Sequence, residues 1–154
     1  MTYELRDHTA DVAVEATGAS LSATFAAVAD GLTAASCESV PDEGGERFEV
    51  TVTAESREAL LFDYVDQLIY ERDVRSVLPV DHDCRVVSPA GTASTEDADD
   101  DEGDATDPEW TVEATARGIP LADVVAREVK AVTYSQMVLE RRDGGWYAYV
   151  VLDV

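Results

Sequence analysis

Lysine is nearly absent from this sequence: Lys130 is its only lysine, and the other ten basic residues are arginines. Basic side chains are few altogether, because 11 lysines and arginines stand against 33 aspartates and glutamates, giving a formal net charge of −22. A chain of this charge repels the phosphate backbone of RNA or DNA. The charge therefore argues against direct, unaided binding of nucleic acid, and any role in nucleic-acid chemistry is expected to run through a partner.

Cysteine is scarce, and long apolar runs are missing. Cys37 and Cys84 lie far apart and form no C-x-x-C motif or disulfide framework, so we expect two small, buried apolar residues. No apolar run approaches the ~18–20 residues that a transmembrane helix requires. The polar start MTYELRDHTA lacks the apolar core of a signal peptide. We expect a soluble, cytoplasmic protein that makes no contact with membranes.

Recognisable catalytic motifs are also missing. The sequence contains no G-x-S-x-G elbow, no phosphate-binding loop, no G-x-G-x-x-G after a strand and no H-E-x-x-H. Only His8 and His82 could serve as a histidine general base. The composition therefore favours a protein that is not itself an enzyme.

The excess of acidic residues has three interpretations. Intrinsic disorder is disfavoured, because 45% of the residues are hydrophobic, enough for a real core. A binding surface for basic partners stays open. Adaptation to high intracellular salt explains the composition best, since the Debye length falls to ~3 Å in molar salt and repulsion on an acidic surface is then largely screened.

The apolar pattern predicts one α+β domain spanning residues 1–154, with two main helices packed on a mixed, mostly antiparallel sheet. Ser20 and Ser56 are N-cap residues ahead of two amphipathic stretches, the first ending near Ser36. Alternation predicts strands at Tyr3–Arg6, Val12–Thr17, Arg47–Glu55, Glu109–Gly118 and in a C-terminal hairpin that turns at Asp143-Gly144-Gly145.

Three further segments are less regular. Val74–Pro89 reads as two short strands joined near Asp81–Asp83, with Pro79 at an edge or a bulge. Leu121–Arg127 is compatible with a short helix after Pro120, while VKAVTYS favours a strand or a turn. The acidic, low-complexity segment at 91–108 does not match the spacing of a calcium-binding EF-hand loop, so we expect a solvated, flexible loop.

Candidate chemistry is concentrated at three places. If the final strand lies beside the strand that starts at Val12, then Asp11, Asp153 and the terminal carboxylate of Val154 meet at one end of a sheet and offer oxygen ligands to a hard divalent cation. The alternative is three exposed acids at strand ends. The Asp-His-Asp run at 81–83 is a short cluster of possible ligands, but its place in a predicted strand connection favours a solvated turn. Lys130 is either a functional ammonium group or a surface residue retained by chance.

Four stretches together resemble the archease family: DHTADVAVEATGASLSATFAAVADGL, EALLFDYVDQLIYERD, EVKAVTYS and the terminal VVLDV. They follow the family's order over nearly the whole chain. The resemblance implies an accessory factor of the GTP-dependent tRNA-splicing RNA ligase, which joins RNA ends through a guanylylated histidine. The protein would promote guanylylation and multiple turnover of that ligase and broaden its nucleotide use, contacting RNA only indirectly.

The resemblance also implies a site. By motif, Asp11, Asp153 and Val154 would bind a divalent cation, Ca²⁺ in the first instance, with Mg²⁺ and Mn²⁺ as alternatives. His8 would shape the turn that presents Asp11. His8, and Lys130 as the only lysine of the chain, are the candidates for a part in activating the ligase. This sequence departs from the family pattern at Ser135, where the family usually has histidine, and in its long acidic segment at 91–108.

Overall fold

The computed structural model describes residues 2–7, 11–89 and 109–154. Within these ranges the chain forms seven strands, two α-helices and one 3-10 helix. In order they are β1 (Thr2–Asp7), β2 (Asp11–Gly18), α1 (Leu21–Ser36), β3 (Glu46–Ala54), α2 (Arg57–Arg75), β4 (Val77–Val87), β5 (Trp110–Pro120), η1 (Leu121–Asp123), β6 (Ala131–Arg142) and β7 (Gly145–Asp153). The predicted positions of His8 and of the 91–108 loop lie outside the described residues.

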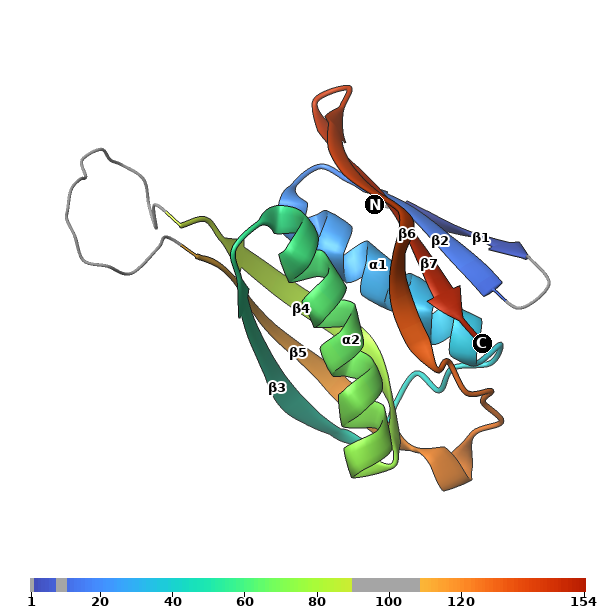
Figure 1. Cartoon of the computed structure of the whole chain (residues 1–154). Helices are drawn as coiled ribbons and strands as arrows, with labels where there is room; N and C mark the ends of the chain where they lie inside the picture. Colours follow the sequence, from blue (N-terminus) through green and yellow to red (C-terminus); the bar gives the residue numbers. More distant parts are fainter. Residues whose placement is uncertain (1, 8–10, 90–108) are drawn as a thin grey trace.

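The strands form two separate antiparallel sheets, one of four strands in the order β1-β2-β7-β6 and one of three in the order β3-β5-β4. The α+β class with two helices is confirmed, but the expected single sheet is divided in two. The division arises because β2 and β6 occupy both edges of β7, which leaves β3, β5 and β4 to pair among themselves. Each helix contacts both sheets, so the helices join the sheets through one core (Figure 1).

The helices begin where the sequence predicts. The Ser20 hydroxyl accepts a hydrogen bond from the Ala23 N–H at 3.0 Å, and the Ser56 hydroxyl accepts one from the Ala59 N–H at 3.0 Å. Each bond satisfies a backbone donor that the first helical turn leaves unpaired. Helix α2 ends at Arg75, and the next residue, Ser76, adopts the left-handed conformation that often stops a helix.

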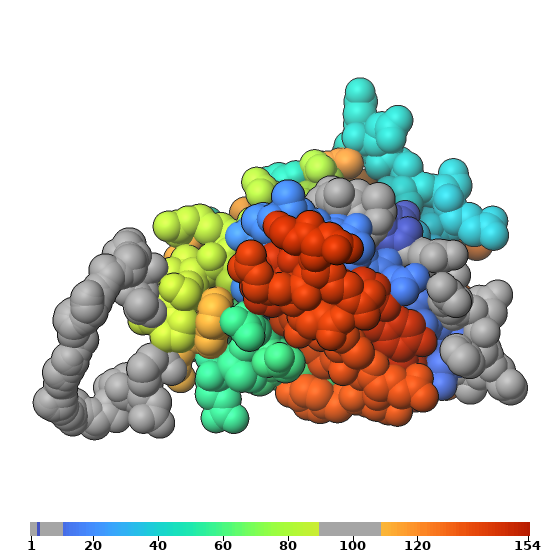
Figure 2. Space-filling model, turned by 90° about the horizontal axis from the view of Figure 1, so that it is seen from above, coloured from blue at the N-terminus to red at the C-terminus, as the bar shows by residue number. Residues whose placement is uncertain are grey.

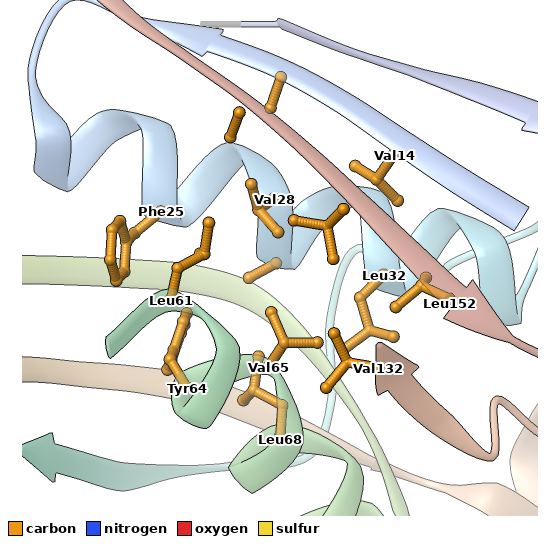
Figure 3. Close-up of a cluster of buried hydrophobic side chains, with 14 of the residues drawn as sticks. Val14, Phe25, Val28, Leu32, Leu61, Tyr64, Val65, Leu68, Val132 and Leu152 are labelled. Atoms are coloured by element: carbon orange, nitrogen blue, oxygen red, sulfur yellow. The ribbon is translucent and has the colours of Figure 1, made fainter. Parts of the chain in front are cut away.

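The core lies between the two helices and the inner faces of the sheets. Figure 3 shows side chains from α1, α2 and the four-stranded sheet pointing toward one another, among them Phe25, Val28, Leu32, Leu61, Tyr64, Val65, Leu68, Val14, Val132 and Leu152. Burying each large aliphatic or aromatic side chain contributes roughly 1.5–3 kcal/mol. This cluster therefore provides the main driving force that holds the two sheets against the helices.

Two local predictions were wrong. Val74–Pro89 does not contain two strands, because β4 continues from Val77 to Val87 and absorbs an irregularity between Val80 and Asp83 without reversing direction. The edge position predicted for Pro79 is confirmed, since β4 lies at the edge of its sheet. The helix considered for Leu121–Arg127 is reduced to η1, because the Arg127 N–H and guanidinium donate instead to main-chain carbonyls at the end of α1.

None of the helices in the described ranges is long and apolar enough to cross a membrane.

Candidate metal-binding site

Asp11 and Asp153 lie directly opposite each other on neighbouring strands. Asp11 is the first residue of β2, Asp153 is the last of β7, and the antiparallel register pairs them. Directly opposed residues of an antiparallel pair have Cβ atoms about 4.5–5.5 Å apart on the same face of the sheet. The structure therefore brings together the two aspartates that the sequence analysis selected.

The two aspartates face away from the core. Val12 and Leu152, their neighbours in sequence, are buried in the hydrophobic cluster, so the alternation of a strand turns Asp11 and Asp153 to the outer face of the four-stranded sheet. Val154 follows Asp153 and packs its side chain against the same core. The end of the chain is thereby held beside the start of β2.

A bulged segment of β6 forms the third side of the site. Thr133 pairs with Val151 and Val138 pairs with Tyr149, so four residues of β6 stand opposite the single residue Val150. Gln136 within this segment has a φ of 62°, and the Ser135 N–H donates to the Thr133 hydroxyl at 3.0 Å. We name Tyr134–Met137 the β6 bulge.

The aspartates and the β6 bulge enclose a shallow pocket of about 350 Å³. Its lining consists of Asp11, Thr133, Ser135, Gln136, Val151 and Asp153. Five of these six side chains can present oxygen: two carboxylates, two hydroxyls and one amide. Such a donor set fits a hard cation such as Ca²⁺ or Mg²⁺ and lacks the sulfur and imidazole ligands that zinc prefers.

The side chains alone do not complete an anionic cage. Among the described residues, no three His, Cys, Asp or Glu side chains gather closely enough to hold a metal ion. A cation between Asp11 and Asp153 would need further oxygens, and Ca²⁺ takes six to eight. The neutral groups of the pocket and a main-chain oxygen of Val154, the next residue along the chain, are of the right chemical type to supply them.

Lys130 lies next to the site through its backbone. Its N–H donates to the carbonyl oxygen of Asp153 at 2.8 Å, which joins the start of β6 to the end of β7. Its side chain is exposed, makes no ion pair with the described residues and does not line the pocket. Ser135, at the position where the family pattern usually has histidine, is exposed and lines the pocket instead.

Residues 81–83 do not form the solvated turn that the sequence favoured, because they lie within β4. Asp81 is exposed and pairs with Arg47 at 2.6 Å and Arg117 at 3.3 Å. The His82 ring turns inward, and its Nε2 lies 2.8 Å from the Thr33 hydroxyl on α1. The irregularity in β4 causes this inward turn, because it shifts the alternation of the strand by its extra residue.

His82 is held neutral. Burial lowers the pKa of its imidazole to about 4, and the charge of Arg47 adds to the effect against the opposing influence of Pro79 and Asp81. The Thr33 hydroxyl donates to the Pro79 carbonyl at 2.8 Å, so Nε2 donates to Thr33. Nδ1 is then the unprotonated nitrogen, and it is buried with no partner among the described residues. Protonating it would bury an unpaired N–H.

Sequence reasoning missed Asp30. Burial and the charge of Asp81 raise the pKa of its carboxyl to about 6, although a hydrogen bond with the His82 backbone lowers it in part. The available signal was an acid between Ala29 and Gly31 on an otherwise apolar face of α1. Asp30 belongs to this interior cluster and lies apart from the Asp11–Asp153 pocket.

Comparisons with known proteins find similarity over nearly the whole chain. The model of the Archease protein family matches residues 3–154. Protein archease of Methanosarcina mazei is 30% identical over 155 residues, covering 99% of this chain and 95% of its own length, and that of Methanosarcina acetivorans is 31% identical with the same coverage.

Solved structures give the same result. Protein 1598 of Methanobacterium thermoautotrophicum superposes with a TM-score of 0.74 at 27% identity, over 99% of this chain and 98% of its own. An archease of Thermotoga maritima, described as a possible chaperone, superposes with a TM-score of 0.57 at 24% identity, which supports the fold alone.

Proposed function

This chain belongs to the archease family, whose pattern spans residues 3–154, and on that basis we propose that it activates the GTP-dependent tRNA-splicing RNA ligase. In this proposal the protein promotes guanylylation and multiple turnover of the ligase in the cytoplasm and contacts RNA only through the ligase. The net charge of −22 supports the indirect route, because an RNA backbone would be repelled.

The observation that carries the proposal is the register that pairs Asp11 with Asp153. We propose that these carboxylates, with a main-chain oxygen of Val154, hold a divalent cation, Ca²⁺ first and Mg²⁺ or Mn²⁺ as alternatives. The cation would supply positive charge to an oxygen-bearing group on the ligase side. Thr133 and Gln136, which line the same pocket, would orient that group or add neutral oxygens.

A role without catalysis is supported by the state of the reactive side chains. The His82 imidazole is turned into the interior and bonded to Thr33. Burial raises the pKa of the Cys84 thiol to about 12, so a thiolate nucleophile is disfavoured there. Cys37 is buried. Within the described part of the chain, these groups do not form a nucleophile and base pair that opens onto a pocket.

The test is ligase guanylylation and turnover with and without this protein. Asp11→Asn and Asp153→Asn remove one charge each and keep the shape of the side chain. We expect each variant to lose activation of the ligase by ~10-fold or more while remaining folded. Asp123→Asn, an exposed acid on η1, is the matched control and should activate as the unaltered chain does. Full activation by both site variants would contradict the metal-site role.

Metal binding is measured on the same variants without the ligase. A cation that binds only the folded chain raises its stability by RT ln(1 + [L]/Kd), about 2.7 kcal/mol at 100 times Kd. We expect added Ca²⁺ to raise the melting temperature of the unaltered chain and of Asp123→Asn but not that of Asp11→Asn. Equal shifts in all three would indicate binding elsewhere.

A second candidate is a general chaperone, because the Thermotoga maritima relative is described as a possible chaperone. A chaperone would suppress aggregation of unrelated unfolded proteins, and Asp11→Asn would leave that activity intact. Turnover of nucleotides or RNA phosphate esters by the isolated protein with metal would instead indicate an enzyme.

A further inference from the structure

The outward face of α2 exposes apolar side chains that a helix would ordinarily bury. Tyr70 is 57% exposed and Val74 is 61% exposed. They belong to a row of four residues spaced four positions apart on α2, namely Phe62, Asp66, Tyr70 and Val74. Side chains at this spacing lie along one ridge of a helix. At 1.5 Å per residue, this ridge is about 18 Å long.

Tyr134 of the β6 bulge extends the ridge toward the candidate metal site. Its ring is 54% exposed and stacks on Phe62, with ring centroids 4.0 Å apart and an angle of 2° between the planes. The next two residues, Ser135 and Gln136, line the Asp11–Asp153 pocket. Figure 1 shows α2 beside β6, and in Figure 2 the green atoms around the start of α2 lie beside the orange and red atoms of β6 and β7.

The ridge carries negative charge that the protein itself does not neutralise. Asp63 and Asp66 are exposed and form no ion pair with the described residues. The three arginines of the helix are engaged elsewhere: Arg57 lies over two tryptophan rings, Arg72 pairs with the adjacent aspartate and Arg75 pairs with a glutamate one turn earlier. Burial and the neighbouring acids Asp63 and Glu55 raise the pKa of the Tyr134 hydroxyl, consistent with this local charge.

We propose that the α2 ridge, defined as Phe62, Asp63, Asp66, Tyr70, Val74 and Tyr134, is the surface by which this protein docks on an arginine- and lysine-bearing surface of the RNA ligase. This inference rests on the proposed function, which names the ligase as partner. Charge complementarity selects a basic protein: nucleic acid, an acidic membrane surface and a second copy of this chain would all be repelled. Docking along the ridge would bring the Asp11–Asp153 pocket to the edge of the interface.

The apolar and aromatic side chains of the α2 ridge contribute to binding differently from its aspartates. Tyrosine is enriched at interface positions that carry much of the binding energy, and its ring accepts arginine by stacking and cation–π contact. Exposed aspartates at the rim mainly accelerate encounter with a basic surface, and salt screens their effect. Tyr70 and Val74 should therefore matter at every salt concentration, and Asp63 and Asp66 chiefly at low salt.

The first experiment measures the Kd of the full chain for its cognate ligase, using the double variant Tyr70→Ser/Val74→Ser. Truncating a hot-spot side chain weakens binding by an order of magnitude or more. We expect the Kd to rise by ~10-fold or more, and the concentration that gives half-maximal activation of the ligase to rise by the same factor. Val125→Ser is the matched control, because Val125 is 94% exposed but lies between η1 and β6. It should bind like the unaltered chain.

The second experiment tests the charge. We expect Asp63→Asn/Asp66→Asn to raise the Kd in the lowest salt that keeps the chain folded and to lose this effect as KCl increases. Asp123→Asn should have neither effect. Asp11→Asn should separate the two sites, because its loss of activation should persist at concentrations that saturate the ligase, whereas the ridge variants should regain activation when their concentration is raised.

The outcomes separate this inference from the proposed function. If the unaltered chain activates the ligase and the ridge variants bind as tightly as Val125→Ser does, the ridge is not the docking surface and the function stands. If the unaltered chain neither binds nor activates the ligase, both proposals are overturned. Circular dichroism confirms that each variant is folded, and the single variant Val74→Ser replaces the double one if the latter unfolds.

Discussion

Two interior side chains, Asp30 and His82, have pKa values displaced in opposite directions by the same burial. The carboxyl is raised to about 6 and the imidazole is lowered to about 4. His82 contributes stability that is present above its ordinary pKa of 6.5 and is lost as the pH falls through 4. Asp30 contributes stability that is present below its ordinary pKa of 3.8 and is lost as the pH rises through 6. The two contributions oppose each other over nearly the same range.

Replacing Asp30 should remove its own pH-dependent contribution to stability and leave that of His82. Asp30→Asn can still accept the hydrogen bond from the His82 backbone but carries no charge to desolvate. We expect this variant to melt higher than the unaltered chain near pH 7, and the gain to shrink as the pH falls from about 6 to 4, where Asp30 is protonated anyway. Thermal melts across this range, compared with Asp123→Asn, provide the measurement. A constant difference at every pH would contradict the prediction.

Helix α1 approaches β2 so closely that only glycine fits between them. A Cβ added at Gly31 would lie 2.4 Å from Cγ1 of Val14, in the buried core. Alanine normally stabilises a helix interior by roughly 0.5–1 kcal/mol over glycine, whereas overpacking a core costs about 1–3 kcal/mol. At this position the cost of overpacking the core exceeds the gain in helix propensity.

Gly31→Ala should therefore destabilise the fold by about 1–2 kcal/mol. Urea unfolding at high KCl measures the change in free energy. The double variant Gly31→Ala/Val14→Ala makes room at the contact, so the two substitutions should be less damaging together than the sum of their separate effects. Additive effects, or a Gly31→Ala variant as stable as the unaltered chain, would show that the contact relaxes easily.

Strands β4 and β5 come together independently of the acidic segment that connects them. Val87 near the end of β4 pairs with Thr111 near the start of β5, and Val86 pairs with Val112. Residues 94–107 offer no apolar side chain larger than alanine to a hydrophobic core. The connection can thus be shortened while its two anchoring strands stay in register.

Deleting residues 94–107 should leave the fold and ligase activation intact. Shortening a connection lowers the entropy cost of closing it, by only about 0.6 kcal/mol for each halving of its length, so stability should change little or rise slightly. A single cooperative transition in urea and an unaltered activation assay are the expected results. Loss of cooperative unfolding would show that the segment takes part in the folded structure.

Self-repulsion is the dominant long-range force on the whole molecule. The formal charge of −22 is spread over 154 residues. Many arginines are already used locally, for example Arg85 with Glu113 at 2.7 Å and Arg47 with Asp81 at 2.6 Å. Pairs so exposed contribute about 0–1 kcal/mol each, too little to offset the general repulsion.

The melting temperature should therefore rise steeply with KCl. At 0.01 M salt the Debye length is ~30 Å, comparable with the size of the domain, and at 1 M it is ~3 Å. We expect unfolding or aggregation in dilute buffer and a cooperative fold in molar KCl. Sucrose at matched water activity is the control, because it favours burial without screening charge. A melting temperature that does not depend on KCl would exclude the interpretation as a high-salt adaptation.

The sequence by itself determined the features that depend on near neighbours. Serine caps and apolar residues at helical spacing located α1 and α2, alternation located most strands, and Asp143-Gly144 located the final hairpin. Composition determined the charge, and four short motifs were enough to indicate the family. Such signals are local because a cap, a turn or an amphipathic face is formed by residues only a few positions apart.

Only the tertiary structure decided which distant residues meet. The division into two sheets, the pairing of Asp11 with Asp153 and the contact of His82 with Thr33 all join segments separated by many residues. The sequence stated the aspartate pairing only as a condition. It favoured a solvated turn at 81–83, because no local pattern marks the extra residue in β4 that changes which face His82 occupies. Sheet order and bulges follow from the packing of the whole core, in which β7 lies between β2 and β6. No local pattern along the chain specifies which strands become neighbours or where a strand takes an extra residue.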